Sequence, residues 1–180
     1  MHPSFVPALD HPIDTRVLVG FTDLIRWFQN TRGRPSAEVF AEIGDFYRKI
    51  DAAVDDVGGT VIKYLGDAAL VVFPEELADV GIMALLQLKR EVDASFRQRR
   101  IDSGMHVNCH FGEVTMGKLG SVDRLDVIGE TVNVCATLPH QGVTLSPQAF
   151  RCLTPEHRRA FHRYTPPITY HPDEVAREKM

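Results

Sequence analysis

The sequence has few cysteines and lacks any long hydrophobic run. Its cysteines are three in number, Cys109, Cys135 and Cys152, with no C-x-x-C pair and no closely spaced set of cysteine and histidine ligands. This excludes a disulfide framework and a zinc motif, and it predicts buried, unreactive thiols in a reducing compartment. No apolar stretch approaches the roughly 18 residues of a membrane-spanning helix, and the N-terminus lacks the basic and apolar regions of a signal peptide. We therefore expect a cytoplasmic protein with no membrane partner.

Charge of one sign is not in excess either. Lysine and arginine number 20 and aspartate and glutamate 24, so the formal net charge is −4. This balance excludes the strongly basic composition that is typical of nucleic-acid-binding domains, and we expect no nucleic-acid partner. Any anionic ligand must then be held by a local group of side chains rather than by the overall charge.

The sequence does contain the pattern of one mixed α+β domain. Its 180 residues, of which 44% are hydrophobic, are enough to bury one core. Strand-like runs lie at 16–23, 60–64, 68–73, 105–112, 113–117 and 143–145, with a further strand ending near 128. Helical spacing of apolar residues covers 23–30, 36–57, 75–100 and 129–138, followed by a helical segment through 161. This order predicts the α+β class, in a ferredoxin-like split βαβ arrangement whose mainly antiparallel sheet has helices packed on it.

The expected domain covers 15–170. The segment before it, 1–14, contains three prolines and no periodicity, and is predicted to be an N-terminal leader. The last residues, 171–180, are predicted to be a C-terminal tail. No internal repeat or low-complexity segment divides the region between them.

Two aspartates stand where predicted strands end. Asp23 closes the first strand, and Asp67 lies in the short turn of the predicted hairpin. A pair of carboxylates suits hard divalent cations such as Mg²⁺, which leaves its remaining positions to phosphates and water. Two metal ions bridged by such a pair suit phosphoryl chemistry. For Asp67 alone, the plainer alternative is a turn residue that accepts hydrogen bonds from local amides.

Three blocks of the sequence resemble the class III adenylate/guanylate (nucleotidyl) cyclase catalytic domain. They are FTDL at 21–24, KYLGDAALVVF at 63–73 and GEVTMGKLGSVDRLDVIGETVNVCATL at 112–138. Their order and spacing match those of the family, and the resemblance extends over about 16–145. It implies a cyclase homology fold and an adenylate cyclase that converts ATP to 3′,5′-cyclic AMP and pyrophosphate, with signal transduction as its setting.

The resemblance also implies which residues hold the metal ions. Asp23 and Asp67, together with the backbone carbonyl of Leu24, correspond to the positions that bind two Mg²⁺ ions, for which Mn²⁺ is a substitute. In the family these ions assist the attack of the ribose 3′-hydroxyl on the α-phosphate. Asp23 and Asp67 are therefore expected to be catalytic residues.

Base and ribose contacts are implied in the same way. Lys63 and Asp126 correspond to the adenine-selecting pair, since a lysine donates to ring N1 and a carboxylate accepts from the exocyclic amine. Asn133 corresponds to the catalytic asparagine that orients the ribose. Each residue also has a plainer alternative. Lys63 is then a solvated lysine, Asp126 is a surface partner of Arg124, and Asn133 is a helix cap or forms a hydrogen bond in the core.

The sequence departs from the family at three places close to the phosphates, and at one of them the C-terminal segment FHRYTPPITYH at 161–171 lacks the lysine that usually binds phosphate. Thr137 stands where active members carry an arginine that stabilises charge on the α-phosphate, an effect worth about 10³ to 10⁵ in rate in comparable phosphoryl transfers. The turn after Asp23 lacks the usual glycine, and Arg26 there is a candidate to supply charge instead. Two hypotheses follow: an adenylate cyclase of low activity, or a degenerate cyclase homology domain that binds nucleotide or dimerises to regulate a protein partner.

The resemblance finally implies a head-to-tail homodimer with two shared active sites. One chain is expected to supply the metal-binding aspartates, Asp23 and Asp67. Its partner is expected to supply Lys63, Asp126 and Asn133. Twofold symmetry then gives two equivalent sites at one interface.

Overall fold

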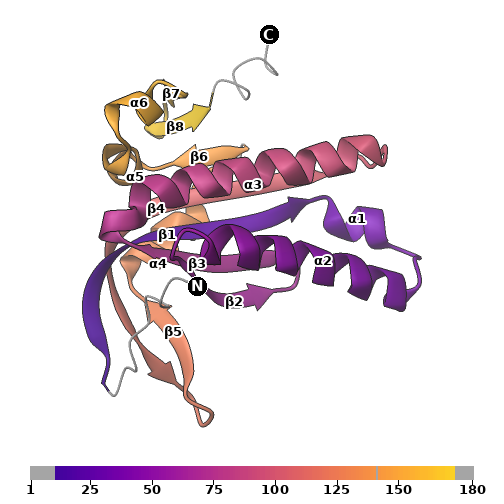
Figure 1. Ribbon diagram of the computed structural model, residues 1–180, viewed down its shortest axis with the longest axis horizontal. Helices are drawn as coiled ribbons and strands as arrows, with labels where there is room; N and C mark the ends of the chain where they lie inside the picture. The colour runs from indigo at the N-terminus through magenta and orange to yellow at the C-terminus, as the bar shows by residue number, and fades with distance from the viewer. Residues whose placement is uncertain (1–10, 141, 173–180) are drawn as a thin grey trace.

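The computed structural model describes residues 11–140 and 142–172. Residues 1–10 of the predicted leader and 173–180 of the predicted tail lie outside the described residues. The rest of the chain has a mixed α+β structure, in which two long helices lie across one face of a sheet (Figure 1). The predicted class is therefore confirmed. Among the described residues, none of the helices is both long enough and apolar enough to cross a membrane.

The sheet is mainly antiparallel. Its strand order is β2-β3-β1-β4-β6-β8-β7, and β5 pairs with β4 beside this path. Only the pairing of β4 with β6 is parallel among the described strands. The strands are β1 (Ile13–Ile25), β2 (Thr60–Leu65), β3 (Ala68–Pro74), β4 (Gly104–Leu119), β5 (Arg124–Ile128), β6 (Val143–Leu145), β7 (Phe161–Tyr164) and β8 (Thr169–Pro172).

Two long helices follow from the predicted apolar periodicity. The helices are α1 (Trp27–Thr31), α2 (Ser36–Asp55), α3 (Ala78–Gln98), α4 (Glu130–Thr137), α5 (Pro147–Cys152) and α6 (Pro155–Arg158), and a 3₁₀ turn, η1 (Glu75–Leu77), precedes α3. The buried face of α2 presents Phe46, Ile50 and Val54 at helical spacing. The helix ends before Gly58, whose φ of 78° is a left-handed conformation that glycine adopts without steric cost.

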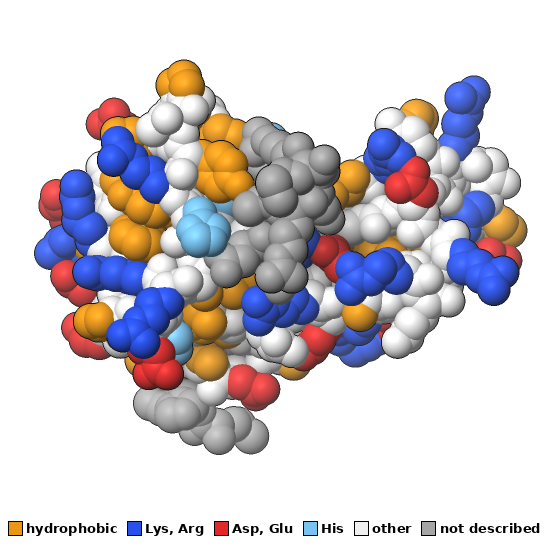
Figure 2. All heavy atoms as spheres, turned by 90° about the horizontal axis from the view of Figure 1, so that it is seen from above, with side chains coloured by type: hydrophobic (Ala, Val, Ile, Leu, Met, Phe, Trp, Pro, Cys, Tyr) orange, Lys and Arg blue, Asp and Glu red, His pale blue; other side chains and the backbone are white. Residues whose placement is uncertain are grey.

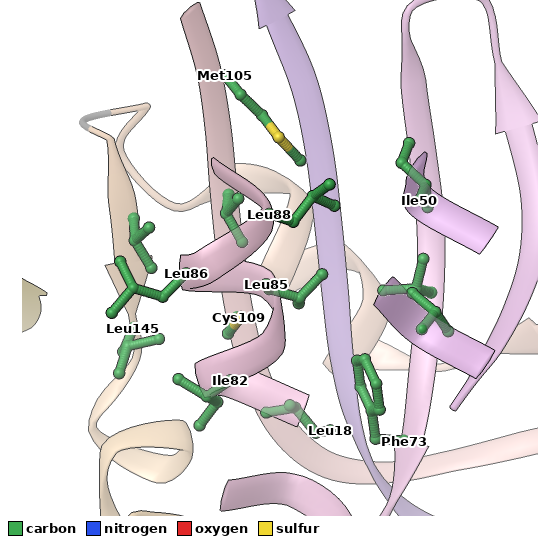
Figure 3. Close-up of a cluster of buried hydrophobic side chains, with 14 of the residues drawn as sticks. Leu18, Ile50, Phe73, Ile82, Leu85, Leu86, Leu88, Met105, Cys109 and Leu145 are labelled. Atoms are coloured by element: carbon green, nitrogen blue, oxygen red, sulfur yellow. The ribbon is translucent and has the colours of Figure 1, made fainter. Parts of the chain in front are cut away.

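The main core lies between these helices and the sheet. Figure 3 shows Ile82, Leu85 and Leu86 of α3 pointing toward side chains of the strands. On β1, Leu18 points to this core, whereas Val17 and Val19 point to a second cluster on the opposite face of the sheet. The alternation follows from the period of two along a strand. The second cluster lies against β5 and α4. The candidate site lies on this face of the sheet.

The structure corrects three boundaries that the sequence pattern suggested. The helix expected from Asp23 begins only at Trp27, because β1 stays paired with β4 through Ile25, although its pairing with β3 ends at Asp23. Asp23 therefore lies within a strand rather than at its end. The strands expected at 105–112 and 113–117 are one continuous strand, β4. The helical segment expected through 161 is divided into α5 and α6.

Charged side chains of both signs are scattered over the described surface that Figure 2 shows, which is the side of α3 and of the β7–β8 pair. Lysine and arginine lie among aspartate and glutamate on this side. A mixed surface of this kind agrees with the small net charge of the sequence.

Candidate active site

The two aspartates approach each other at one end of the sheet. Asp23 on β1 pairs with Ala68, the residue that directly follows Asp67. Burial raises the pKa of Asp23, and the nearby charge of Asp67 raises it further, while His140 and the backbone amide of Leu24 act in the opposite direction. The sequence thus places two carboxylates close enough to repel each other. Such a pair becomes favourable when a cation lies between its members.

The donor set fits a divalent metal ion. Among the described residues, no three side chains of histidine, cysteine, aspartate or glutamate form a metal-binding group. A metal ion here would have two carboxylates from Asp23 and Asp67 and would take its other ligands from a backbone carbonyl, phosphate and water. This is the coordination that Mg²⁺ favours.

A second pair of side chains lies on the same face. The Lys63 ammonium on β2 forms an ion pair with the Asp126 carboxylate on β5, at 2.6 Å between Nζ and Oδ2. The other carboxylate oxygen of Asp126 accepts a hydrogen bond from the amide of Val127. Both side chains are partly exposed, by 38% for Lys63 and 24% for Asp126. Lys63, rather than Arg124, is therefore the partner of Asp126.

The short helix α4 brings Asn133 and Thr137 to the surface one turn apart. It packs closely on β4 because Gly112 has no side chain. A Cβ atom at that position would lie 2.5 Å from the hydroxyl oxygen of Thr131. That hydroxyl donates a hydrogen bond of 2.6 Å to the carbonyl of Glu113, which ties the first turn of α4 to the strand.

Comparison with known proteins identifies the family of the chain. Residues 12–165 match the family model of the adenylate and guanylate cyclase catalytic domain. The chain belongs to this family. An adenylate cyclase of Anabaena cylindrica is 27% identical over 139 residues, which cover 72% of this chain and 27% of that protein. The chain thus spans about a quarter of the length of this relative.

Solved cyclase structures share the fold of this cyclase domain. A bacterial light-regulated adenylyl cyclase aligns with a TM-score of 0.79 at 20% identity, covering 93% of this chain and 54% of that one. The guanylyl cyclase Cya2 aligns with a TM-score of 0.73 at 17% identity, covering 88% of this chain and 91% of that one. Because both kinds of cyclase share the fold, the choice between ATP and GTP must be argued from individual side chains.

Two residues lie at positions where the family resemblance implies contact with phosphate, Arg26 and Thr137. Arg26 has a φ of 57°, a left-handed conformation that glycine adopts without steric cost, although this turn lacks the glycine that the family carries. Its guanidinium forms an ion pair with Asp102. The Thr137 hydroxyl lies 3.0 Å from the carbonyl of Asn133 in its own helix. In this structure, both groups have partners inside the chain.

Three residues near the aspartates were not expected from the sequence to belong to the site. His106 on β4 lies opposite Asp23 in the strand register, and its ring contacts His140 edge to face. Tyr47 of α2 reaches the turn that carries Asp67, where its hydroxyl donates a hydrogen bond of 2.5 Å to the carbonyl of Gly66. In the sequence, Tyr47 belongs to the apolar stripe of a helix, and only its phenol hydroxyl indicates a second role.

Proposed function

We propose that this cyclase domain binds ATP with two divalent metal ions and converts it slowly to 3′,5′-cyclic AMP and pyrophosphate. The observation that carries the choice of ATP is the contact between Lys63 and Asp126. A cationic donor and an anionic acceptor, held side by side, complement the ring N1 and the exocyclic amine of adenine. Guanine presents a donor and an acceptor in the reverse order.

The other residues take roles that suit their positions. Asp23 and Asp67 hold the metal ions with the carbonyl of Leu24, and Mn²⁺ can replace Mg²⁺ because both accept oxygen ligands. When bound, the ions supply Lewis-acid activation of the ribose 3′-hydroxyl and of the α-phosphate. The exposed Asn133 side chain orients the ribose by hydrogen bonds.

We infer a low rate from the residue at position 137. A threonine has no charge to offer the α-phosphate, and the Thr137 hydroxyl has carbonyl acceptors in its own helix. The missing arginine accounts for a loss of about 10³ to 10⁵ in rate, by analogy with other phosphoryl transfers. The same observation favours the second candidate, a degenerate cyclase homology domain that binds nucleotide and regulates a protein partner.

The active unit in this proposal is a head-to-tail homodimer that shares its two sites. The homodimer is supported by exposed apolar side chains that lie around the two aspartates and around the pair of Lys63 and Asp126. Leu65, beside the Asp67 turn, is 50% exposed, and Ile128, two residues after Asp126, is 59% exposed. Val122, between β4 and β5, is 66% exposed. Burial of these side chains against a second copy removes apolar surface from water.

Incubation with ATP and Mn²⁺ or Mg²⁺ tests the proposal, with cyclic AMP and pyrophosphate separated by chromatography. The wild-type chain should form both products, and Asp67→Ala should lose product formation together with metal-dependent ATP binding. ATP binding without product in the wild-type chain supports the regulatory domain instead. Equal turnover in Asp67→Ala excludes Asp67 as a metal ligand.

The shared site has a separate test by complementation. Asp23→Ala and Asn133→Ala should each be inactive, but a mixed dimer has both lesions in one site and an intact second site. Random pairing should then restore about a quarter of the wild-type activity on symmetry grounds. The two variants are co-expressed or refolded together, and subunit exchange is verified. No recovery despite exchange, with a measurable wild-type rate, means that the site is not shared between chains.

A further inference from the structure

We infer that Tyr47 is a positioning residue that holds Asp67 in the geometry for metal binding. This inference rests on the proposed role of Asp67 as a metal ligand. Tyr47 lies on α2, 20 residues before Asp67 in the sequence, and it acts through the backbone of the turn rather than on the nucleotide itself. No part of the family comparison assigns it such a role.

The first observation is the contact itself. The Tyr47 hydroxyl donates to the carbonyl oxygen of Gly66 at 2.5 Å, and this carbonyl belongs to the peptide unit that leads directly into Asp67. Burial raises the pKa of Tyr47, and the charge of Asp67 raises it further, so the hydroxyl keeps its proton at neutral pH. Tyr47 is thus a permanent donor to the turn.

The second observation is that the turn has little other packing. Gly66 has a φ of 66°, and a Cβ atom at this position would have no atom within 4 Å beyond its neighbours in the chain. A short exposed turn of this kind moves easily because few contacts restrain it. The Tyr47 hydrogen bond connects it to a long helix, α2, whose buried residues Phe46 and Ile50 belong to the main core.

The third observation is that Tyr47 is itself held in place. Its ring stacks on that of Tyr64, with 3.7 Å between centroids and 13° between planes. The Tyr64 hydroxyl donates to the carboxylate of Asp51, one turn further along α2, and lies 3.1 Å from the carbonyl oxygen of Tyr47. The stacked pair therefore links α2 to the strand that enters the turn, β2.

The hydrogen bond has a clear task when no metal is bound. Asp67 directly precedes Ala68, the strand partner of Asp23, so two like charges lie close together, and their repulsion favours movement of the exposed turn away from β1. A hydrogen bond that keeps the turn in place holds the two carboxylates at the separation that a metal ion requires. Loss of the bond should therefore weaken metal binding, because ordering of the turn then accompanies binding.

The test compares Tyr47→Phe with a matched control, Tyr170→Phe. Both changes remove only a phenol hydroxyl from a stacked ring pair, since Tyr170 stacks on Phe150 with 3.7 Å between centroids. Mn²⁺ binding to the full chain is measured by the electron paramagnetic resonance of the free ion, with 3′-deoxy-ATP as a nucleotide that cannot cyclise. Tyr47→Phe should raise the dissociation constant of Mn²⁺ about fivefold, the effect of one hydrogen bond, and Tyr170→Phe should leave it unchanged.

Kinetics provide a second readout that a purely structural role does not move. Tyr47→Phe should raise the Mn²⁺ concentration for half-maximal cyclic AMP formation, while kcat at saturating Mn²⁺ stays within about twofold of the wild-type value. Unchanged Mn²⁺ affinity in Tyr47→Phe, with or without a lower melting temperature, overturns the inference, as does an equal loss in both variants. Absence of Mn²⁺ binding by the wild-type chain instead refutes the metal assignment of the proposed function, and the inference with it.

Discussion

Replacement of Gly112 by alanine should destabilise the domain because the new methyl group collides with Thr131, and Thr131→Ala should remove this effect. The new Cβ atom would lie 2.5 Å from the Thr131 hydroxyl oxygen, whereas ordinary van der Waals contact begins at 3.4 Å. The oxygen must therefore retreat by almost one ångström. It is held by its hydrogen bond to the Glu113 carbonyl, so the retreat strains that bond and displaces the start of α4.

The magnitude follows from three contributions. Forcing an extra methyl group into a packed site costs roughly 1–3 kcal/mol, and weakening the Thr131 hydrogen bond adds up to about 1 kcal/mol. The change from glycine to alanine stabilises by about 0.4–1 kcal/mol through the unfolded chain. We expect Gly112→Ala to lower the free energy of unfolding by about 2 kcal/mol, the middle of the range of roughly 0–3.6 kcal/mol that these terms allow.

In a Thr131→Ala background the same change should have the opposite sign. Thr131→Ala alone loses one hydrogen bond, about 1 kcal/mol, and removes the two atoms that the new methyl group meets first. The Cβ atom of residue 131 lies 3.5 Å away, an ordinary contact. Gly112→Ala then keeps only its effect on the unfolded chain and should stabilise by about 0.4–1 kcal/mol.

The assay is urea unfolding of the wild-type chain, both single variants and the double variant at one protein concentration, because subunit association shifts apparent stability. Gly44→Ala on α2 is the control, since its new Cβ atom meets nothing closer than 3.6 Å. It should stabilise by about 0.5–1 kcal/mol. Equal effects of Gly112→Ala in both backgrounds, within about 0.5 kcal/mol, would refute the steric explanation.

Three further predictions concern the site. Because burial and Asp67 raise the pKa of Asp23, its charged form opposes folding; Asp23→Asn should raise the melting temperature at pH 7 in the absence of divalent ions. The gain should disappear below the unfolded-state pKa of about 3.9, and a pH-independent difference would contradict this cause. Thr137→Arg should raise kcat with little change in ATP affinity, because the added charge acts mainly in the transition state; a wild-type rate typical of active cyclases with no gain in the variant means that another arginine fills the role. Lys63→Glu combined with Asp126→Cys should weaken ATP binding and improve turnover of GTP, and a preserved preference for ATP in competition assays places the purine pocket elsewhere.

The long helices and the hairpin were predictable because local patterns determine them. The apolar stripe of α2 and the three-residue gap between the predicted strands at 60–64 and 68–73 specify burial and chain reversal without distant information. The run after Asp23 was misleading, since Leu24 and Phe28 are four residues apart and satisfy a helical period, while the sheet register keeps Ile25 in β1. Strand pairing outweighs a weak local pattern of this kind.

A glycine in a strand pattern can mark a break between strands or a place where another side chain packs closely, and the sequence alone does not distinguish the two. Gly112 suggested a break between strands, but β4 continues through it, and its missing side chain makes room for Thr131. For the site, the contact of Lys63 with Asp126 joins residues 63 positions apart. Only resemblance to a family related the two residues beforehand, and the role of Tyr47 depends on a contact that no local pattern encodes.

The ion pair of Lys63 and Asp126 also has a mechanical consequence. The strands β2, β3, β1, β4 and β5 are neighbours in that order, and β2 and β5 are its two ends. The ion pair joins these two ends, so the five strands form a closed ring around the second apolar cluster. A ligand that binds both side chains competes with the ion pair between them, so the free energy of forming that ion pair lowers the affinity for the ligand. By reciprocity, conditions that loosen the β4–β5 hairpin, such as high ionic strength at this partly exposed pair, release both groups for the ligand. If the nucleotide of the proposed function engages Lys63 and Asp126, its binding should therefore change the rate of amide hydrogen exchange in β5.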